Sequence, residues 1–261
     1  MMTNFKAITF EKTNNLAIIA LNRPECLNAL NATMKLELLE AIRHVGAKHS
    51  GIRGLLITGT GRGFCAGADL IETPENKDAG SDLIDTFHPF LQELMALDIP
   101  VVTAVNGIAA GAGMSIALSA DIVFASESAE FLQAFVKIGL VPDAGSSYIL
   151  PRLIGEARAK AMMMLGEQLP AQTAYDWGMV HKVVSAENLM TEALDTAQKL
   201  ACGPSIALAG IRTLLKESWR NSYSEQLQLE ALIQRTSSQT KDCVEGVTAF
   251  AQKRVPHFSG Q

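Results

Sequence analysis

An uncharged strand that runs directly into a cluster of glycines is the feature that most constrains how this chain can fold. Residues 101–105 (VVTAV) are apolar or β-branched, which is typical of a strand covered on both faces. Three glycines then fall within residues 107–113 (GIAAGAG), where the backbone can turn tightly and approach a ligand closely. The uncharged residues 115–118 predict a buried helix that begins near Ala112 and presents its first N–H groups to the glycine loop.

A second strand followed by glycines occurs earlier in the chain. Residues 54–59 (GLLITG) predict a short buried strand, and glycines recur at positions 59, 61, 63 and 67. This spacing is neither G-x-x-x-x-G-K-[ST] nor G-x-G-x-x-G, so neither type of nucleotide loop is predicted. The histidines form no H-E-x-x-H pattern and the four cysteines no C-x-x-C pattern. We therefore expect no metal site and no metal or redox cofactor.

Charge and composition exclude several classes of function. The chain has 22 Lys and Arg against 27 Asp and Glu, and its net charge of −5 argues against non-specific binding of nucleic acid. No apolar run approaches the ~18 residues of a membrane span, and the first residues lack the apolar centre of a signal peptide. The scattered cysteines indicate free thiols in a reducing compartment. We expect a globular cytoplasmic protein with no membrane or nucleic-acid partner.

Up to residue 145 the chain alternates strand and helix patterns, which predicts crossover connections and a sheet rich in parallel strands. Apolar residues recur at helical spacing after Asn31, which would cap that helix, and again over residues 81–97. Beyond Asp143 the patterns are helical, with strand character only at residues 179–184. The predicted strands are residues 7–10, 16–21, 54–59, 101–105 and 121–125, and the predicted later helices are residues 157–165, 171–177, 187–201, 205–218, 225–237 and 243–253.

Six segments carry a resemblance to a known family. They are LNRPECLNAL, GFCAGADL, AVNGIAAGAG, SADIVFAS, VPDAGSS and EGVTAFAQKR. Together they resemble the crotonase (enoyl-CoA hydratase/isomerase) superfamily over almost the whole chain. The Asp of VPDAGSS is most similar to the ring-1,2-epoxyphenylacetyl-CoA isomerase branch of phenylacetate degradation. The resemblance implies an α/β fold of the crotonase (ClpP-like) type, a spiral of ββα units with a C-terminal helical extension.

The same resemblance implies a domain organisation and partners. We expect residues 1–200 to form the spiral core and residues 201–261 to form a helical trimerisation region. Members of the family form trimers that pair into hexamers, so a homotrimer or hexamer is expected here. The expected small-molecule partner is an acyl-CoA thioester, in which CoA is part of the substrate and not a cofactor.

Two backbone amides would form the centre of the site. The resemblance implies that the N–H groups of Ala68 and Ala112 form an oxyanion hole for the thioester oxygen. Where the family often has glycine at position 112, alanine still leaves the N–H available. The loop around Ala68 would hold the adenine and pantetheine of CoA through Ala66, Gly67, Asp69 and Leu70. From the residues alone, Asp69 could equally cap a helix.

The chain departs from the hydratase pattern at two positions. Hydratases of this family use two glutamates, and the matching residues here are Ser115 and Phe135. Neither can act as a carboxylate base, which argues against water addition by the two-glutamate route. Ser115 could hydrogen-bond a water or simply pack inside its helix, and we expect Phe135 to line the acyl pocket.

Asp143 is the one carboxylate that remains at a matching functional position. An aspartate ahead of Ala-Gly at a helix start is also a good helix cap, so the residues alone leave both roles open. The resemblance favours an acid–base role. We expect the apolar side chains of Phe135, Ile138 and Val141 to raise the pKa of Asp143.

Three further residues match family positions near CoA. They are Arg23 in LNRPEC and, in AFAQKR, Phe250 and Lys253. The last two would reach the CoA phosphates of a neighbouring subunit. A surface cation and a packed ring are the simpler alternatives for these residues.

The chain is therefore predicted to be an acyl-CoA isomerase that shifts a double bond or isomerises an epoxyphenylacetyl-CoA ring through a thioester enolate. One alternative is an enoyl-CoA hydratase (a lyase) that activates water with Asp143. Another is a catalytically weak member of the fold that binds acyl-CoA or RNA, although no dense run of Lys and Arg supports RNA. The acyl group would be selected by residues 73–90.

Overall fold

The computed structural model describes residues 5–71 and 78–261, and its largest element is a six-stranded sheet. The strand order is β1-β2-β3-β5-β7-β10, in which β1 pairs antiparallel with β2 and every other pair is parallel. The predicted parallel-rich sheet is therefore confirmed. Its strands are β1 (Ile8–Thr13), β2 (Leu16–Leu21), β3 (Gly54–Gly59), β5 (Val101–Val105), β7 (Ile122–Ser126) and β10 (Lys182–Val184).

A second, four-stranded sheet was not predicted. Its order is β4-β6-β8-β9, and all four strands are three residues long: β4 (Gly63–Cys65), β6 (Ile108–Ala110), β8 (Glu130–Leu132) and β9 (Gln168–Pro170). The first three follow β3, β5 and β7 in the chain and pair in parallel. Each long strand therefore turns into a short one before its helix, which is the repeating ββα unit of a spiral.

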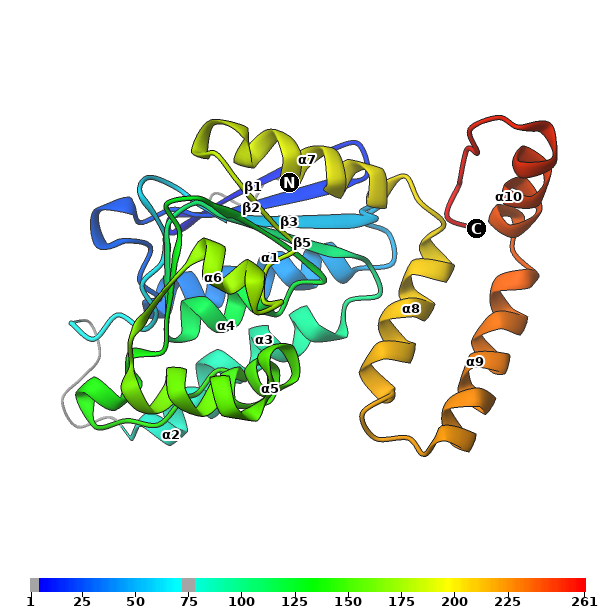
Figure 1. Ribbon diagram of the computed structural model, residues 1–261. Helices are drawn as coiled ribbons and strands as arrows, with labels where there is room; N and C mark the ends of the chain where they lie inside the picture. Colours follow the sequence, from blue (N-terminus) through cyan, green and yellow to red (C-terminus); the bar gives the residue numbers. More distant parts are fainter. Residues whose placement is uncertain (1–4, 72–77) are drawn as a thin grey trace.

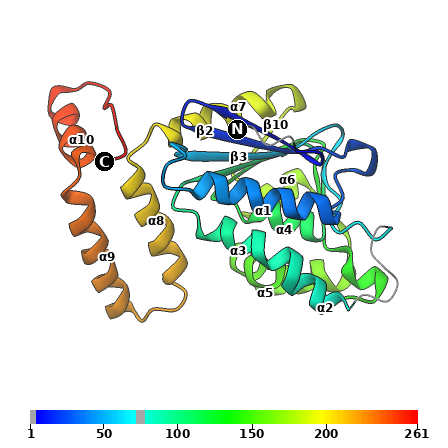
Figure 2. The same cartoon turned by 180° about the vertical axis from the view of Figure 1, so that it is seen from behind.

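Helices cover both faces of the six-stranded sheet (Figure 1). On one face lies α7 (Ala186–Ala201), which packs on Leu56 of β3 and Phe124 of β7. Leu55 and Ile57, which alternate with Leu56, enter the larger core on the other face. That face is covered by α1 (Ala32–Gly46), α3 (His88–Ala96), α4 (Ala112–Leu118) and α5 (Ser146–Leu165), with α6 (Ala171–Asp176) nearby. Figure 2 shows the same layers from behind.

The helix boundaries follow local chemistry. The predicted cap is confirmed, because Asn31 Oδ1 accepts the Met34 N–H at 2.9 Å. The single helix expected over residues 81–97 is instead α2 (Ala79–Asp82), a π-helical turn η2 (Leu83–Phe87) and α3. The helix expected from residue 157 begins earlier, at Ser146, and kinks at Gly155 (φ 77°, ψ 160°). Two 3₁₀ turns, η1 (Pro24–Cys26) and η3 (Ala134–Ile138), complete this part of the chain.

Three helices extend away from the sheets and form what we call the tail (Figures 1 and 2). They are α8 (Ser205–Glu217), α9 (Tyr223–Ser238) and α10 (Lys241–Gln252). We call the described residues before Cys202 the core. At the crossing of α8 and α9, a Cβ at Gly210 would lie 2.6 Å from a methyl group of Ile233. The trimerisation role expected for residues 201–261 stays a prediction.

Polar contacts of Arg53 seat the tail on the core. Its guanidinium donates to Ser205 Oγ (2.9 Å), to the Gly203 carbonyl and to the Phe258 carbonyl (3.3 Å). The buried Asp242 carboxylate accepts the backbone N–H groups of Ser259 (2.7 Å) and Gly260 (2.9 Å). The segment after α10 is thereby folded back to the start of α8. A second contact joins Arg212 of α8 to Asp121 of the core. Within the described ranges, no helix is both long and apolar enough to cross a membrane.

Candidate active site

The two glycine-rich loops leave the second sheet side by side. Strands β4 and β6 pair in parallel, with Cys65 opposite Ala109, so the residues that follow each strand meet at the same edge. Gly67 lies between the loops at φ 96°, and a Cβ there would lie 2.9 Å from the Ala110 carbonyl oxygen and 3.6 Å from the Ala112 nitrogen. Only glycine fits this close approach. It places Ala68, the next residue, beside the start of α4.

The backbone amides of Ala68 and Ala112 are left available by their surroundings. Ala68 faces Leu30 in a single β-bridge, where Leu30 donates to the Gly67 carbonyl (2.8 Å) and Asp69 donates to the Leu30 carbonyl (3.2 Å). This pattern passes over the Ala68 N–H. Ala112 is the first residue of α4, so its N–H has no partner within that helix. Neither N–H donates a hydrogen bond to a residue that the structure describes. Two such donors can stabilise negative charge on one oxygen.

Asp143 does not cap a helix. The cap position of α5 belongs to Gly145, and no side chain in the described part of the chain makes a cap hydrogen bond there. Asp143 Oδ1 is buried without a hydrogen-bond partner in the described parts of the chain. Burial raises the pKa of Asp143 to about 6. The capping role that the sequence left open is therefore wrong, and the pKa shift has the expected direction.

The apolar neighbours expected around Asp143 differ in their own burial. Phe135 is buried, whereas Ile138 and Val141 are 53% and 78% exposed. The Phe135 ring lies over the loop before α4, since a Cβ at Gly111 would be 3.3 Å from its Cζ. Of the three, only Phe135 belongs to the interior that reaches the start of α4. Of residues 73–90, expected to select the acyl group, positions 73–77 lie outside the described residues.

Ser115 links the loop before α4 to Asp143. Its side chain is 1% exposed, and its Oγ lies 3.4 Å from both the Gly111 and the Asp143 carbonyl oxygens. The structure therefore brings together the predicted residues Gly67, Ala68, Ala112, Ser115, Phe135 and Asp143. With serine and phenylalanine at two of these positions, Asp143 supplies the carboxylate of this group.

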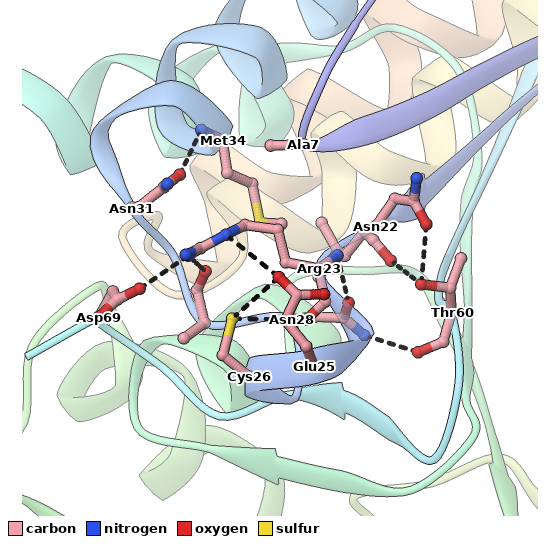
Figure 3. A network of polar contacts seen from close by, with 12 residues as sticks. Ala7, Asn22, Arg23, Glu25, Cys26, Asn28, Asn31, Met34, Thr60 and Asp69 are labelled. Carbon is pink, nitrogen blue, oxygen red and sulfur yellow. Dashed lines mark hydrogen bonds and ion pairs between the residues drawn. The ribbon is translucent and has the colours of Figure 1, made fainter. Parts of the chain in front are cut away.

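Arg23 and Asp69 brace the first loop (Figure 3). Arg23 Nη1 donates to Asp69 Oδ2 at 2.7 Å and to the Ala29 carbonyl at 2.8 Å. Asp69 Oδ1 also accepts the Ile71 N–H at 3.2 Å, within a turn rather than a described helix. This ion pair fixes Asp69 within the first loop, directly after the predicted residues Ala66 and Gly67 and before Leu70, whose side chain is exposed.

Sequence reasoning missed Asn28, which joins the segment between β2 and α1 to the connection between β3 and β4 (Figure 3). Its side chain is fully buried, its Oδ1 accepts the Arg23 N–H at 2.8 Å, and its Nδ2 donates to the carbonyls of Thr60 (2.9 Å) and Gly63 (2.8 Å). Its φ of 57° is one that asparagine tolerates better than most residues. An asparagine beside a turn was the only signal in the sequence, and it did not separate Asn28 from Asn22 or Asn31.

The sequence of the chain is similar to those of known proteins. The model of the family described as enoyl-CoA hydratase/isomerase matches residues 11–261. The chain belongs to this family. It is 43% identical over 248 residues to 1,2-epoxyphenylacetyl-CoA isomerase of Escherichia coli, which covers 93% of this chain and 94% of that protein. It is 40% identical over 259 residues to a protein of Rhodobacter capsulatus named probable enoyl-CoA hydratase, covering 99% and 100% of the two chains.

A solved structure extends the comparison to the fold. The enoyl-CoA hydratase from a Polaromonas species superposes with a TM-score of 0.91 at 34% identity, covering 97% of this chain and 100% of that chain. The crotonase fold predicted from the sequence is thus confirmed. The chain is an enzyme of the enoyl-CoA hydratase/isomerase family, and hydratases and isomerases both occur among its relatives.

Two predicted residues of this family member lie far from the loops. Phe250 is 87% exposed on α10, and Lys253 follows the end of that helix at φ 54°. Figure 1 places α10 beyond α8, at the opposite end of the molecule from α2. The single chain therefore does not bring these two residues to Asp143, and their proposed contact with a neighbour's CoA stays a prediction.

We also searched the described part of this enoyl-CoA hydratase/isomerase for metal-ligand groups and for a reactive thiol near the site. Those residues contain no group of three or more His, Cys, Asp and Glu side chains that could hold a metal ion. Cys65 lies just before the first loop, but it is fully buried, and burial raises its pKa to about 12. Its thiol therefore stays protonated and packs against Gly113 of α4.

Proposed function

We propose that the protein is an acyl-CoA isomerase in which the N–H groups of Ala68 and Ala112 hold a thioester enolate and Asp143 is the single acid–base residue. The observation that carries the proposal is the Asp143 carboxylate, whose Oδ1 is buried without a partner among the described residues, on a residue whose carbonyl contacts Ser115 of α4. A group in that state gains a proton readily and loses it readily, because its pKa of about 6 lies near neutral pH.

The chemistry follows from the two kinds of group. Asp143 takes a proton from a carbon of the acyl chain, and the electron pair left behind moves to the thioester oxygen. The two N–H groups stabilise that oxygen anion, and the loss of one such donor typically costs about 2.7–4 kcal/mol. Asp143 then returns the proton to a different carbon, which shifts a double bond or, in an epoxyphenylacetyl-CoA, completes a ring isomerisation. No cofactor takes part in these steps.

The rest of the first loop would bind CoA. Ala66, Gly67, Asp69 and Leu70 would contact its adenine and pantetheine, with Arg23 holding the loop in shape through its 2.7 Å ion pair to Asp69. The tail would meet neighbouring copies in a homotrimer or hexamer, in which Phe250 and Lys253 approach the CoA of the next subunit. A cytoplasmic location fits a substrate of this class.

A hydratase is the second candidate, because relatives of the chain carry that name. It would need Asp143 to activate water with help from Ser115. The Ser115 hydroxyl proton is directed at two backbone carbonyls, and the partner carboxylate of a two-glutamate site is missing. Binding of RNA without catalysis is disfavoured by the net charge of −5.

The deciding experiment supplies a 3-enoyl-CoA and a 2-enoyl-CoA separately and identifies the products by chromatography. An isomerase interconverts the two, whereas a hydratase forms a hydroxyacyl-CoA from the 2-enoyl substrate. Asp143→Asn removes the base at constant size, so we expect turnover to fall about 10²–10⁴-fold with little change in CoA binding. Asp98→Asn, at an exposed aspartate, is the control and should stay fully active. An Asp143→Asn enzyme of normal turnover would refute the proposal.

A further inference from the structure

We infer that Ser146 and Ser115 are positioning residues, which hold the backbone carbonyl of Asp143 and thereby fix its carboxylate at a set place relative to the Ala112 amide. The inference rests on the proposed function, in which that carboxylate moves the proton. It concerns two side chains on different helices, α4 and α5, whose hydroxyls converge on one oxygen.

The Asp143 carbonyl oxygen is surrounded by donors. Ser146 donates to it twice, from its Oγ at 2.8 Å and from its backbone N–H at 3.0 Å. Ser115 Oγ approaches the same oxygen at 3.4 Å from α4. Both serine side chains are buried, at 3% and 1% exposure, so water does not compete for these contacts. The carbonyl of Asp143 is held from two sides, while Oδ1 of its own carboxylate has no partner among residues 5–71 and 78–261.

The backbone at this turn needs such support. Ala144 has a φ of 51° and Gly145 a φ of 85°, so two successive residues occupy the left-handed region. For alanine this conformation costs on the order of 1–2 kcal/mol, and the turn keeps it only if its surroundings hold it. The three donors to the Asp143 carbonyl supply that hold. Without them, the turn and the carboxylate upon it can relax together.

Ser115 also ties the carboxylate to the oxyanion side of the site. Its Oγ lies 3.4 Å from the Gly111 carbonyl as well, and Gly111 immediately precedes Ala112. One hydroxyl therefore spans the residue before the oxyanion amide and the residue that carries the base. A base and an oxyanion donor must be held at fixed separation, because a misplacement of about 1 Å can lower a rate by about 10²-fold.

The test compares Ser146→Ala, Ser115→Ala and a matched control, Ser119→Ala. Ser119 is also buried in this region, and its hydroxyl also donates to a helix carbonyl, that of Ser115 at 2.7 Å, but it does not contact Asp143. We call the contacts of Ser146 and Ser115 with the Asp143 carbonyl the clamp, and Ser146→Ala and Ser115→Ala the clamp variants. We expect each clamp variant to lose about tenfold in kcat with KM for the CoA thioester unchanged within about twofold. The control should keep its kcat within about twofold.

Two readouts separate positioning from a general loss of stability. As the carboxylate relaxes toward solvent, the pH midpoint of kcat should move below the value of the unaltered enzyme in both clamp variants and stay in place in Ser119→Ala. In an Asp143→Asn background, the same serine changes should cause no further loss of turnover, since no base remains to be positioned. Should one clamp variant fail to fold, the other decides.

The outcomes keep the two proposals apart. If Asp143→Asn is inactive but a folded clamp variant retains normal kcat and pH midpoint, the clamp is overturned and the acid–base role of Asp143 stands. Additive losses in the Asp143→Asn background would overturn the clamp in the same way. If Asp143→Asn itself keeps normal turnover, the proposed function and the clamp both fall.

Discussion

The core and the tail bury their residues in opposite ways. All seven residues of α4 and all five of β5 are buried, whereas α9 has no buried residue and α8 has only Gly210. The tail nevertheless carries large apolar side chains with about half or more of their surface exposed: Ile211, Leu215, Leu227, Leu232, Val244, Val247 and Phe250. The core contains a large apolar interior, whereas the helices of the tail leave much of their apolar surface exposed, which is typical of contact surfaces.

The two regions are also joined by different forces. Inside the core, strands and helices meet through apolar contacts over two faces of one sheet. Two arginines join the tail to the core: Arg53 of the core contacts Ser205 at the start of α8, and Arg212 of α8 pairs with Asp121 of the core. Polar contacts of this kind set a direction without supplying a large buried area. The tail is therefore held in place by the core but, on our proposal, stabilised by neighbouring copies.

The largest expected effect comes from adding one methyl group to a glycine in each region. In Gly113→Ala, the new Cβ would lie 2.3 Å from the Cys65 carbonyl oxygen, so we expect unfolding to become easier by about 3 kcal/mol or more. In Gly246→Ala on α10, the Cβ would lie 3.5 Å from the Phe258 ring, an ordinary contact. That variant should gain about 0.5–1 kcal/mol from helix preference. Urea denaturation measures both, and equal losses would contradict the contrast.

The next effect is on assembly. Leu215 in the tail and Leu36 on α1 are similarly exposed, at 66% and 64%. We expect Leu215→Glu to convert a trimer or hexamer into monomers at micromolar concentration without lowering monomer stability, because only the tail face is covered in the assembly. Leu36→Glu should leave the assembly intact. Light scattering coupled to size exclusion gives both masses, and an unaltered protein that runs as a monomer would remove the proposal.

Much of this contrast was visible in the sequence. The uncharged runs of β3 and β5 predict buried strands, and α8 to α10 keep helical spacing and clear stop signals. The second sheet was missed because each of its strands has three residues. That is too short for a period of two to show, and β4 and β6 lie within glycine clusters.

The sequence predicted the main residues of the site but not the hydrogen bonds that join them. Family resemblance supplied Ala68, Ala112 and Asp143, and the sequence alone left a helix cap as an alternative for Asp143. Only the structure decides this, because it depends on where one carboxylate oxygen points. The contacts of Asn28, 32 and 35 residues apart in the chain, and the hydroxyl contact from Ser115 across 28 residues, have no local pattern. Such contacts are set by the packing of the spiral.

The last expected effect concerns the stability of the core at Asp143, where a buried carboxylate oxygen has no hydrogen-bond partner among the described residues. Its pKa is raised from 3.8 to about 6. The protonated form therefore contributes stability that is present below about pH 4 and lost as the pH rises through 6. Because the group is partly exposed, we expect Asp143→Asn to be more stable than the unaltered protein by only about 1 kcal/mol at pH 8.

The same gain should shrink as the pH is lowered toward 4, where both proteins carry a neutral side chain. Urea denaturation at pH 5 and pH 8 measures the difference, with Asp98→Asn as the flat reference. Asparagine caps a helix about as well as aspartate, so a cap would give a stability difference close to zero at both pH values. An Asp143→Asn protein that gains no stability at pH 8 relative to pH 5 would therefore contradict the raised pKa of Asp143.

The contact between Arg53 and Phe258 has a consequence for how the protein is made. The two residues are 205 positions apart, and a ribosome that adds about 5–20 residues per second needs about 10–40 s to produce the second after the first. The six-stranded sheet is complete once β10 (Lys182–Val184) has been made, whereas this contact with the end of the chain forms only after residue 258. On our proposal of a homotrimer or hexamer, the tail therefore takes its final place on the core only when synthesis is nearly finished, so subunits pair late in synthesis.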